Sequence, residues 1–178
     1  MTIAAQILKT AKLSGDFVLR SGARTDTYFD KYLFESDPRL LKAIVEVMAR
    51  DIPENTEILA GLEMGGIPVV TALSQLTGLP CTFIRKEPKA YGTCKYAEGP
   101  PMAGRQVILV EDVVSSGGAI LDALAMLRSD QINPAVTLCV IDRETGGKEA
   151  LSAEGIELRA AFTMSEIEGS KDRGTSSS

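Results

Sequence analysis

Short apolar segments alternate with glycine-containing turns and helix-like segments along most of the chain, and this rhythm limits the fold more than any other feature. Strand-like segments are expected at 58–62, 81–84, 107–110 and 136–141, and helix-like segments at 67–76 and 118–128. Strands that alternate with helices form a mostly parallel sheet, because right-handed crossovers place helices on both faces. The sequence therefore predicts an α/β fold.

The flanking segments carry their own signals. Elements are expected as a helix over 2–13 ended by Ser14-Gly15, two short strands on either side of the polar stretch 20–27, a helix from Asp37-Pro38 to Asp51, and an edge strand over 156–162. No internal repeat or linker interrupts the pattern. One domain is expected over 1–168, followed by a disordered polar tail at 169–178.

The composition excludes several classes of function. The chain has no histidine, which excludes Ser-His-Asp and Cys-His catalysis and any zinc site built on imidazole. Its net charge of −5 argues against general binding to nucleic acid or anionic membranes, and no apolar run has the length of a membrane span. Three cysteines without paired spacing, and an N-terminus without a signal-peptide pattern, indicate a cytoplasmic protein.

The segment 107–120 carries the strongest chemical signal. A buried strand leads into Glu111-Asp112 at its carboxyl end, and a Ser/Gly turn, Ser115-Ser116-Gly117-Gly118, then opens a helix. Backbone N–H groups of such a turn converge on an anion, and adjacent carboxylates can accept hydrogen bonds from sugar hydroxyls or organise a hydrated Mg²⁺. The alternative is an ordinary turn whose acids only cap the helix. The paired acids favour a cradle for a sugar phosphate.

A second signal is the basic window 85–95. It holds four basic residues and one acidic residue, a charge of +3 that leaves −8 for the rest of the chain. It opens the Pro- and Gly-rich stretch 86–104, which is expected to be a long flexible surface loop. A basic lid suits a polyanion such as pyrophosphate, because its cations can neutralise a leaving group. The alternative is a solvated charged loop.

Together these motifs resemble the type I phosphoribosyltransferases, and Arg85-Lys86-x-x-Lys89 at the start of the loop is similar to the orotate phosphoribosyltransferase branch. Other segments resemble that branch in the same order: 17–22 with 28–30 resemble its orotate-binding segment, 61–68 its pyrophosphate-side loop, and 141–143 the strand end whose arginine meets orotate. The resemblance covers about residues 10–165. It implies an N-terminal hood over 1–35 and a lid over 86–104.

The resemblance also implies roles for individual residues. Lys86, Lys89 and Asp112 would be catalytic. The residues that would bind phosphoribosyl pyrophosphate (PRPP) are Arg85, Lys86, Lys89, Tyr91, Glu111, Asp112, Val113, Val114, Ser115, Ser116, Gly117, Gly118 and Ala119. Those that would bind orotate are Arg20, Tyr28, Phe29, Ser115 and Arg143. Tyr91 stands where many members have histidine, and Arg20 stands where lysine is common.

The implied reaction joins orotate to PRPP and gives orotidine 5′-phosphate and pyrophosphate in pyrimidine synthesis. Mg²⁺ would be held mainly through PRPP, reaching Glu111 and Asp112 through water, and the lid of one subunit would act across the interface of a homodimer. Two alternatives remain open from the residues. One is a phosphoribosyltransferase for another base, and the other is a non-catalytic regulator that senses PRPP.

Overall fold

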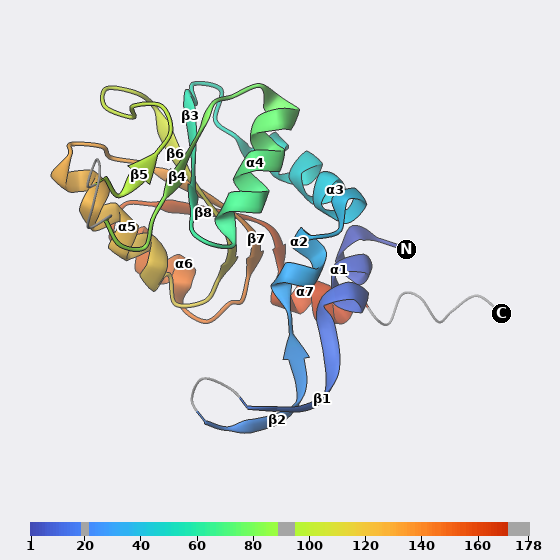
Figure 1. Cartoon of the computed structure of the whole chain (residues 1–178). Helices are drawn as coiled ribbons and strands as arrows, with labels where there is room; N and C mark the ends of the chain where they lie inside the picture. The colour runs from blue at the N-terminus through green and yellow to red at the C-terminus, as the bar shows by residue number, and fades with distance from the viewer. Residues whose placement is uncertain (19–21, 89–94, 171–178) are drawn as a thin grey trace.

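The centre of the molecule is a six-stranded sheet (Figure 1). The structure is a computed structural model and describes residues 1–18, 22–88 and 95–170. The strand order is β5-β4-β3-β6-β7-β8, and every neighbouring pair is parallel except β4 with β5. The strands are β3 (Ile58–Leu62), β4 (Cys81–Ile84), β5 (Ala97–Glu98), β6 (Val107–Val114), β7 (Val136–Asp142) and β8 (Glu157–Thr163). This arrangement confirms the predicted α/β fold.

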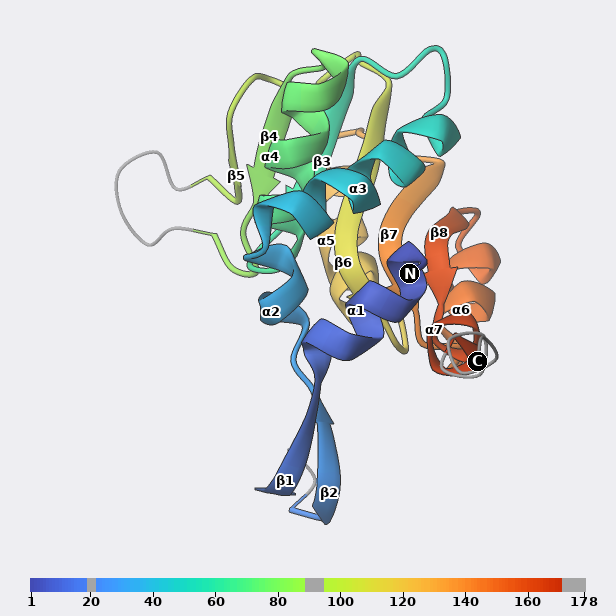
Figure 2. The ribbon, with the colours of Figure 1, turned by 90° about the vertical axis from the view of Figure 1, so that its right-hand side faces the viewer.

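Helices cover both faces of the sheet (Figure 2). One face carries α1 (Ile3–Ala11), α2 (Lys31–Glu35), α3 (Pro38–Met48), the short η1 (Ala49–Asp51), α4 (Gly66–Thr77) and α7 (Met164–Gly169). The other face carries α5 (Gly118–Ser129) and α6 (Gly147–Ala153). The strands β1 (Lys12–Val18) and β2 (Arg24–Phe29) form a separate antiparallel hairpin that projects away from this body.

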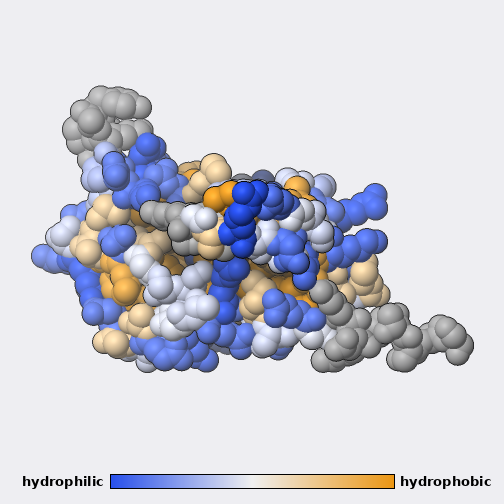
Figure 3. Space-filling view, turned by 90° about the horizontal axis from the view of Figure 1, so that it is seen from below, coloured by the Kyte–Doolittle hydropathy of each residue, from blue (hydrophilic) through white to orange (hydrophobic). Residues whose placement is uncertain are grey.

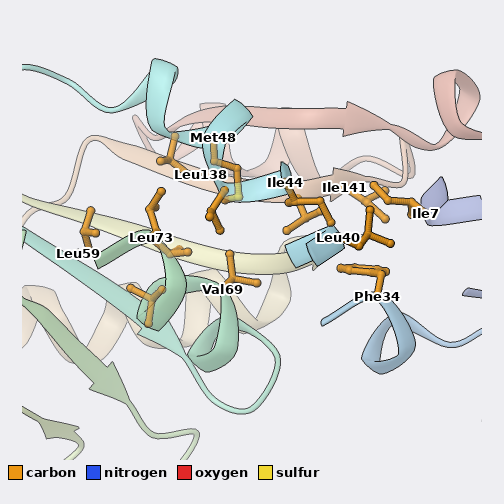
Figure 4. Close-up of a cluster of buried hydrophobic side chains, with 14 of the residues drawn as sticks. Ile7, Phe34, Leu40, Ile44, Met48, Leu59, Val69, Leu73, Leu138 and Ile141 are labelled. Atoms are coloured by element: carbon orange, nitrogen blue, oxygen red, sulfur yellow. The ribbon is translucent and has the colours of Figure 1, made fainter. Parts of the chain in front are cut away.

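Alternation along the strands divides the apolar side chains into two cores. In β3, Leu59 points to the α3/α4 face, whereas Ile58 and Ala60 point to the α5 face. Figure 4 shows the first core, in which Ile44 and Met48 of α3 meet side chains of α4 and of the sheet. Since the central strands are buried on both faces, they read in the sequence as nearly continuous apolar runs.

The chain reverses its direction of travel across the sheet between β3 and β6. From β3 the chain crosses over α4 to β4, whereas from β6 it crosses over α5, on the opposite face, to β7. The loops that follow β3 and β6 therefore diverge and leave a crevice at the carboxyl edge of the sheet. Ligands of open α/β folds bind at such a point.

Several predicted boundaries need correction. The first helix ends at Ala11, and Ser14-Gly15 lie inside β1 at an irregularity of its register instead of ending the helix. The strand predicted over 107–110 continues to Val114, because its pairing with β7 runs that far. Gly169 is the last residue of α7 and does not begin a disordered tail as predicted, and the rest of the predicted tail, residues 171–178, lies outside the described part. Within the described residues, no helix combines the length and apolar character needed to cross a membrane.

Candidate active site

Three adjoining cavities occupy the crevice at the carboxyl ends of β3 and β6. The central cavity has a volume of about 740 Å³, the phosphate-loop cavity beside α5 about 180 Å³, and the hairpin cavity beneath β2 about 450 Å³. Val113 lines all three, and Lys31 with Tyr32 lines both the central and the hairpin cavity. The three cavities therefore form one continuous site with three compartments.

The phosphate-loop cavity is built by the turn between β6 and α5. Gly117 adopts a left-handed conformation with φ of 80°, which a residue with a side chain rarely adopts, and α5 begins at the next residue. Both serine side chains of the turn are exposed. The first residues of this twelve-residue helix line the cavity, and the first N–H groups of a helix have no partner within it, so the turn can bind an anion about the size of one phosphate.

A second glycine turn supports the phosphate loop from behind. A Cβ atom on Gly147, the first residue of α6, would lie 2.4 Å from the carbonyl oxygen of Ser115 and 2.7 Å from Val114 Cγ1. The phosphate loop and α6 therefore approach as closely as their backbones allow. No sequence motif marks Gly147, because the contact joins segments about 30 residues apart in sequence.

Glu111 and Asp112 lie within β6 and are both buried. The Asp112 N–H group donates to Glu111 Oε1 at 3.0 Å, and the Val113 N–H group donates to Asp112 Oδ1 at 2.6 Å. Both carboxylates line the central cavity, and Glu111 also lines the phosphate-loop cavity. Glu111 thus borders both the turn and the central cavity, and Asp112 borders the central cavity.

Asp112 is held by residues from two other elements. The Nζ atom of Lys31, at the start of α2, lies 2.5 Å from Asp112 Oδ2. A Cβ atom on Gly65, in the loop after β3, would lie only 1.7 Å from the same oxygen, so the carboxylate occupies space that a side chain would need. Glu35, one turn after Lys31, is only 5% exposed, and neither of its carboxyl oxygens has a hydrogen-bond partner among the described residues.

This cluster holds three carboxyl groups and one ammonium, and their pKa values diverge. Burial raises the pKa of Glu35 to about 9, and the neighbouring Asp112 adds to the effect. Burial likewise raises the pKa of Glu111. Burial also opposes ionisation of Asp112, but the neighbouring Glu111, Glu35 and Lys31 side chains outweigh burial and lower its pKa. Asp112 therefore carries the negative charge, and a neutral Glu35 can donate a hydrogen bond to it.

The basic segment after β4 borders the central cavity. Arg85 and Lys86 both line it, and the Nε–H group of Arg85 is buried without a hydrogen-bond partner among the described residues. The Lys86 N–H group donates to Glu63 Oε1 at 2.5 Å, which links this segment to the loop after β3. The Arg85 N–H group donates to the Tyr96 carbonyl oxygen at 2.7 Å, and β5 pairs with β4 inside the stretch expected to be a loop. The two ends of the basic segment are thus held side by side.

The hairpin cavity brings together the residues expected to bind a base. Tyr28, Phe29, Ser115 and Arg143 all line it. Tyr28 is 44% exposed, with its ring 5.5 Å from that of Phe17, whereas the Phe29 ring packs toward the core 6.4 Å from that of Phe34. Neighbouring residues of a strand point to opposite sides, so Tyr28 is the more accessible of the two rings.

Every described residue that the sequence singled out for PRPP or orotate lines one of the three cavities. Arg20, Lys89 and Tyr91 lie outside the described residues. No sequence motif pointed to four further residues of the site, Lys31, Tyr32, Glu35 and Asp122. Asp122 lies one turn into α5 and lines the central cavity, and a spacing of four residues from Gly118 was the only signal for it.

The donor groups suit a metal ion that a polyanionic ligand shares. Among the described residues, no cluster of three acidic, cysteine or histidine side chains could hold an ion by itself. The carboxyl groups of Glu63, Glu111 and Asp122 nevertheless line the central cavity. Mg²⁺ keeps several waters and uses few protein carboxylates when phosphates complete its shell, so these residues fit an ion reached through water.

The surface seen from below the molecule is mixed in character (Figure 3). Hydrophobic side chains form small separate areas among strongly hydrophilic ones across the described part of this face. The central cavity is also mixed in character, because the charged residues Lys31, Arg85 and Asp122 line it together with Leu62, Ile84 and Met126, which suits a ligand that combines phosphates with a planar ring.

Known proteins have the same fold and similar sequences. The phosphoribosyl transferase domain family matches residues 36–154. An orotate phosphoribosyltransferase of Nocardioides sp. is 46% identical over 97% of both chains, and that of Methanocella arvoryzae is 41% identical over 88% of this chain and 90% of its own. The orotate phosphoribosyltransferase of Mycobacterium tuberculosis, solved with inorganic phosphate, superimposes with a TM-score of 0.82 at 25% identity over 93% and 96% of the chains. The chain therefore belongs to the orotate phosphoribosyltransferase family of type I phosphoribosyltransferases.

Proposed function

We propose that this protein transfers the phosphoribosyl group of PRPP to orotate, releasing pyrophosphate and forming orotidine 5′-phosphate for pyrimidine biosynthesis. The observation that carries the proposal is the meeting of three compartments at Val113. One compartment suits a monophosphate, one suits a polyanion beside basic residues, and one suits an anionic ring beside Tyr28 and Arg143. PRPP and orotate together present these three groups.

Each compartment receives one part of the substrates in this proposal. The 5-phosphate binds the turn from Ser115 to Ala119, and Val113 and Val114 form the wall behind it. The ribose lies beside Glu111 and Asp112, and the pyrophosphate lies in the central cavity near Arg85 and Lys86. Lys89 and Tyr91 are proposed to reach the pyrophosphate from the lid.

Orotate is proposed to bind in the hairpin cavity. Tyr28 and Phe29 border its ring, Ser115 lies between ring and phosphate, and Arg143 pairs with the carboxylate. The guanidinium presents two parallel donors, which match both carboxylate oxygens. Arg20 is proposed to approach the orotate and the pyrophosphate together.

The chemistry requires positioning and charge stabilisation. As the bond between the anomeric carbon and the pyrophosphate oxygen breaks, positive charge develops on the ribose and negative charge on the pyrophosphate. The ionised Asp112 stabilises the first charge, and Lys86 and Lys89 stabilise the second. Ionised orotate attacks the anomeric carbon through a ring nitrogen, so a histidine base is not needed.

Mg²⁺ bound to PRPP would supply further neutralisation of the pyrophosphate. Glu111 and Asp112 are proposed to contact it through water, while Lys86 and Arg85, which line the same cavity, hold the pyrophosphate. Cys81 and Cys139 are both free thiols, which suits a reducing compartment, and we place the enzyme in the cytoplasm.

We further propose a homodimer in which the lid, 86–104, acts across the interface. The supporting observation is the hairpin of the N-terminal hood, 1–35, which projects from the single domain 1–168. A hairpin of two strands is marginally stable alone, and Val18 at the end of β1 is exposed. A second copy of the chain would cover such a hairpin.

The test is the fall in orotate absorbance with PRPP and Mg²⁺, compared with uracil, adenine and hypoxanthine as acceptors. We expect turnover with orotate as acceptor and none with the other three bases. Arg143→Ala should raise the KM for orotate about tenfold or more and leave the KM for PRPP nearly unchanged, and Arg143→Lys should restore only part of the loss. Arg105→Ala, a change far from the cavities on the exposed turn before β6, is the control. An unchanged orotate KM in Arg143→Ala would contradict the assignment of the base.

A further inference from the structure

Lys31 is a cation of the site that the motifs did not reveal. It is the first residue of α2, at the point where the projecting hairpin joins the body of the molecule. Its side chain is about one-third exposed and lines both the central and the hairpin cavity. Lys31 thus lies on the border between the compartments proposed for the pyrophosphate and for orotate.

The backbone around Lys31 is fixed by two hydrogen bonds. The Asp30 N–H group donates to the Ala11 carbonyl oxygen at 2.8 Å, which ties this segment to α1. The Asp30 side chain accepts from the Tyr32 N–H group at 3.1 Å and caps α2. The backbone of Lys31 therefore has a defined position at the start of α2.

Asp112 fixes the other end of the side chain. The Lys31 Nζ atom lies 2.5 Å from Asp112 Oδ2 and 5.3 Å from the centre of the Tyr32 ring. An ammonium has three N–H donors, and Asp112 uses one of them. The absence of a side chain at Gly65 makes this arrangement possible, since a Cβ atom there would collide with Asp112 Oδ2.

The central cavity has more acidic than basic residues in its described lining, so each cation matters for binding a polyanion. Its described lining has the cations Lys31, Arg85 and Lys86 against the acids Glu63, Glu111, Asp112 and Asp122. The loop after β3, which borders the pyrophosphate compartment, contributes Glu63 and no cation of its own. Glu63 would repel a polyanion beside this loop, and Lys31 is the cation of the described lining that comes from outside the basic segment after β4.

Lys31 keeps its positive charge in this setting. Burial would lower its pKa, but the hydrogen bond and the negative charge of Asp112 outweigh burial and raise the pKa above its ordinary value. The direction of this shift agrees with the short contact between the two groups. Lys31 is thus a charged donor at the border of two compartments.

We propose that Lys31 binds the pyrophosphate group of PRPP and that Asp112 and Gly65 are its positioning residues. This inference rests on the proposed function. When the bond between the anomeric carbon and oxygen breaks, its electron pair stays on the pyrophosphate oxygen. The N–H donors of Lys31 that do not bind Asp112 stabilise that charge together with Arg85 and Lys86, which line the same cavity.

The experiment compares Lys31→Gln and Lys31→Arg with the wild-type protein. Lys31→Gln should raise the KM for PRPP about tenfold to a hundredfold, the effect of losing a charge-assisted hydrogen bond, with a much smaller change in the KM for orotate. Calorimetric binding of Mg²⁺-pyrophosphate should weaken by a similar factor. Lys31→Arg keeps the charge and should recover much of both losses. The matched control is Lys42→Gln, which removes an exposed lysine paired with Glu46 at 3.0 Å on α3.

The outcomes separate this proposal from the proposed function. Binding of pyrophosphate does not depend on the acceptor base, so it tests Lys31 even if orotate is not the substrate. Lys31→Gln that binds pyrophosphate as tightly as the wild type would overturn the proposal. Should Lys31→Gln fail to fold, ¹⁵N-lysine spectra of the wild type provide the test, with Lys31→Arg identifying the signal. The Lys31 ammonium resonance must then shift when pyrophosphate is added, and a stationary resonance would also overturn the proposal.

Discussion

At the scale of single residues, Glu35 makes the stability of the fold depend on pH. Burial holds its pKa at about 9 in the folded protein, whereas an unfolded chain releases the proton near the ordinary value of 4.5. Between these values the unfolded state has lost a proton that the folded state retains, so the free energy of unfolding falls as pH rises, by up to about 1.4 kcal/mol per pH unit.

Glu35→Gln removes this proton equilibrium and keeps a donor toward Asp112. We expect the variant and the wild type to be similarly stable at pH 4. The variant should gain stability relative to the wild type as pH rises toward 9, and the difference should level off above that pH. Urea unfolding of both proteins at several pH values measures the effect. A difference that stays constant with pH would show that Glu35 ionises normally in the folded protein.

The residues of the site divide into those that a motif can reveal and those that only packing reveals. Glu111 and Asp112 with the serine and glycine turn stand together in the sequence, so their chemistry could be predicted. Lys31 and Glu35 meet Asp112 from a segment about 80 residues earlier. Charged residues one turn apart are common on helix surfaces, and nothing in the sequence distinguishes this pair from a solvated one.

At the scale of elements, the close approach of α6 to the phosphate loop predicts a selective defect. In Gly147→Ala the new methyl group would overlap the Ser115 carbonyl oxygen and Val114 Cγ1, so the turn must move away from its anion-binding geometry. We expect the KM for PRPP to rise about tenfold and the stability to fall by about 1–3 kcal/mol, as in other overpacked sites. Steady-state kinetics and thermal unfolding measure the two effects.

Gly169→Ala is the matched control for this change. Gly169 lies in α7, and a Cβ atom there would meet no other atom within 4 Å. The control should bind PRPP and unfold like the wild type. If Gly147→Ala raised the KM for orotate but not that for PRPP, the support assigned to α6 would be wrong.

Elements with long apolar patterns could be predicted from the sequence, and short ones could not. The helix capped by Asp37 and the strand β3 agree with their patterns because burial imposes a clear spacing. The five residues of α2 and the seven of α6 are too few to show a helical period. Their positions are fixed by tertiary contacts, among them the Phe34 side chain in the core, and not by local preference.

At the scale of the whole molecule, the fold class followed from the alternation of strands and helices, whereas the order of strands did not. The sequence gives no direct sign that β6 lies beside β3, because their pairing joins segments about 50 residues apart. The acid pair at the end of β6 nevertheless pointed to the correct edge of the sheet, since ligands of such folds bind where the crossovers diverge.

This placement predicts that substrate stabilises the entire domain. PRPP would contact the loop after β3, the end of β6, the start of α5 and the segment after β4, and an unfolded chain offers none of these contacts together. At a PRPP concentration about 100 times its dissociation constant, binding adds about 2.7 kcal/mol to the free energy of unfolding. For a chain of this length that corresponds to a rise in Tm of roughly 5–10 °C.

Thermal unfolding in the presence of Mg²⁺ measures the rise, which should grow with the logarithm of the PRPP concentration. Ribose 5-phosphate, which lacks the pyrophosphate, should give a smaller shift at the same concentration. Equal shifts with the two ligands would mean that the central cavity contributes nothing to binding, and the three-compartment site would have to be abandoned.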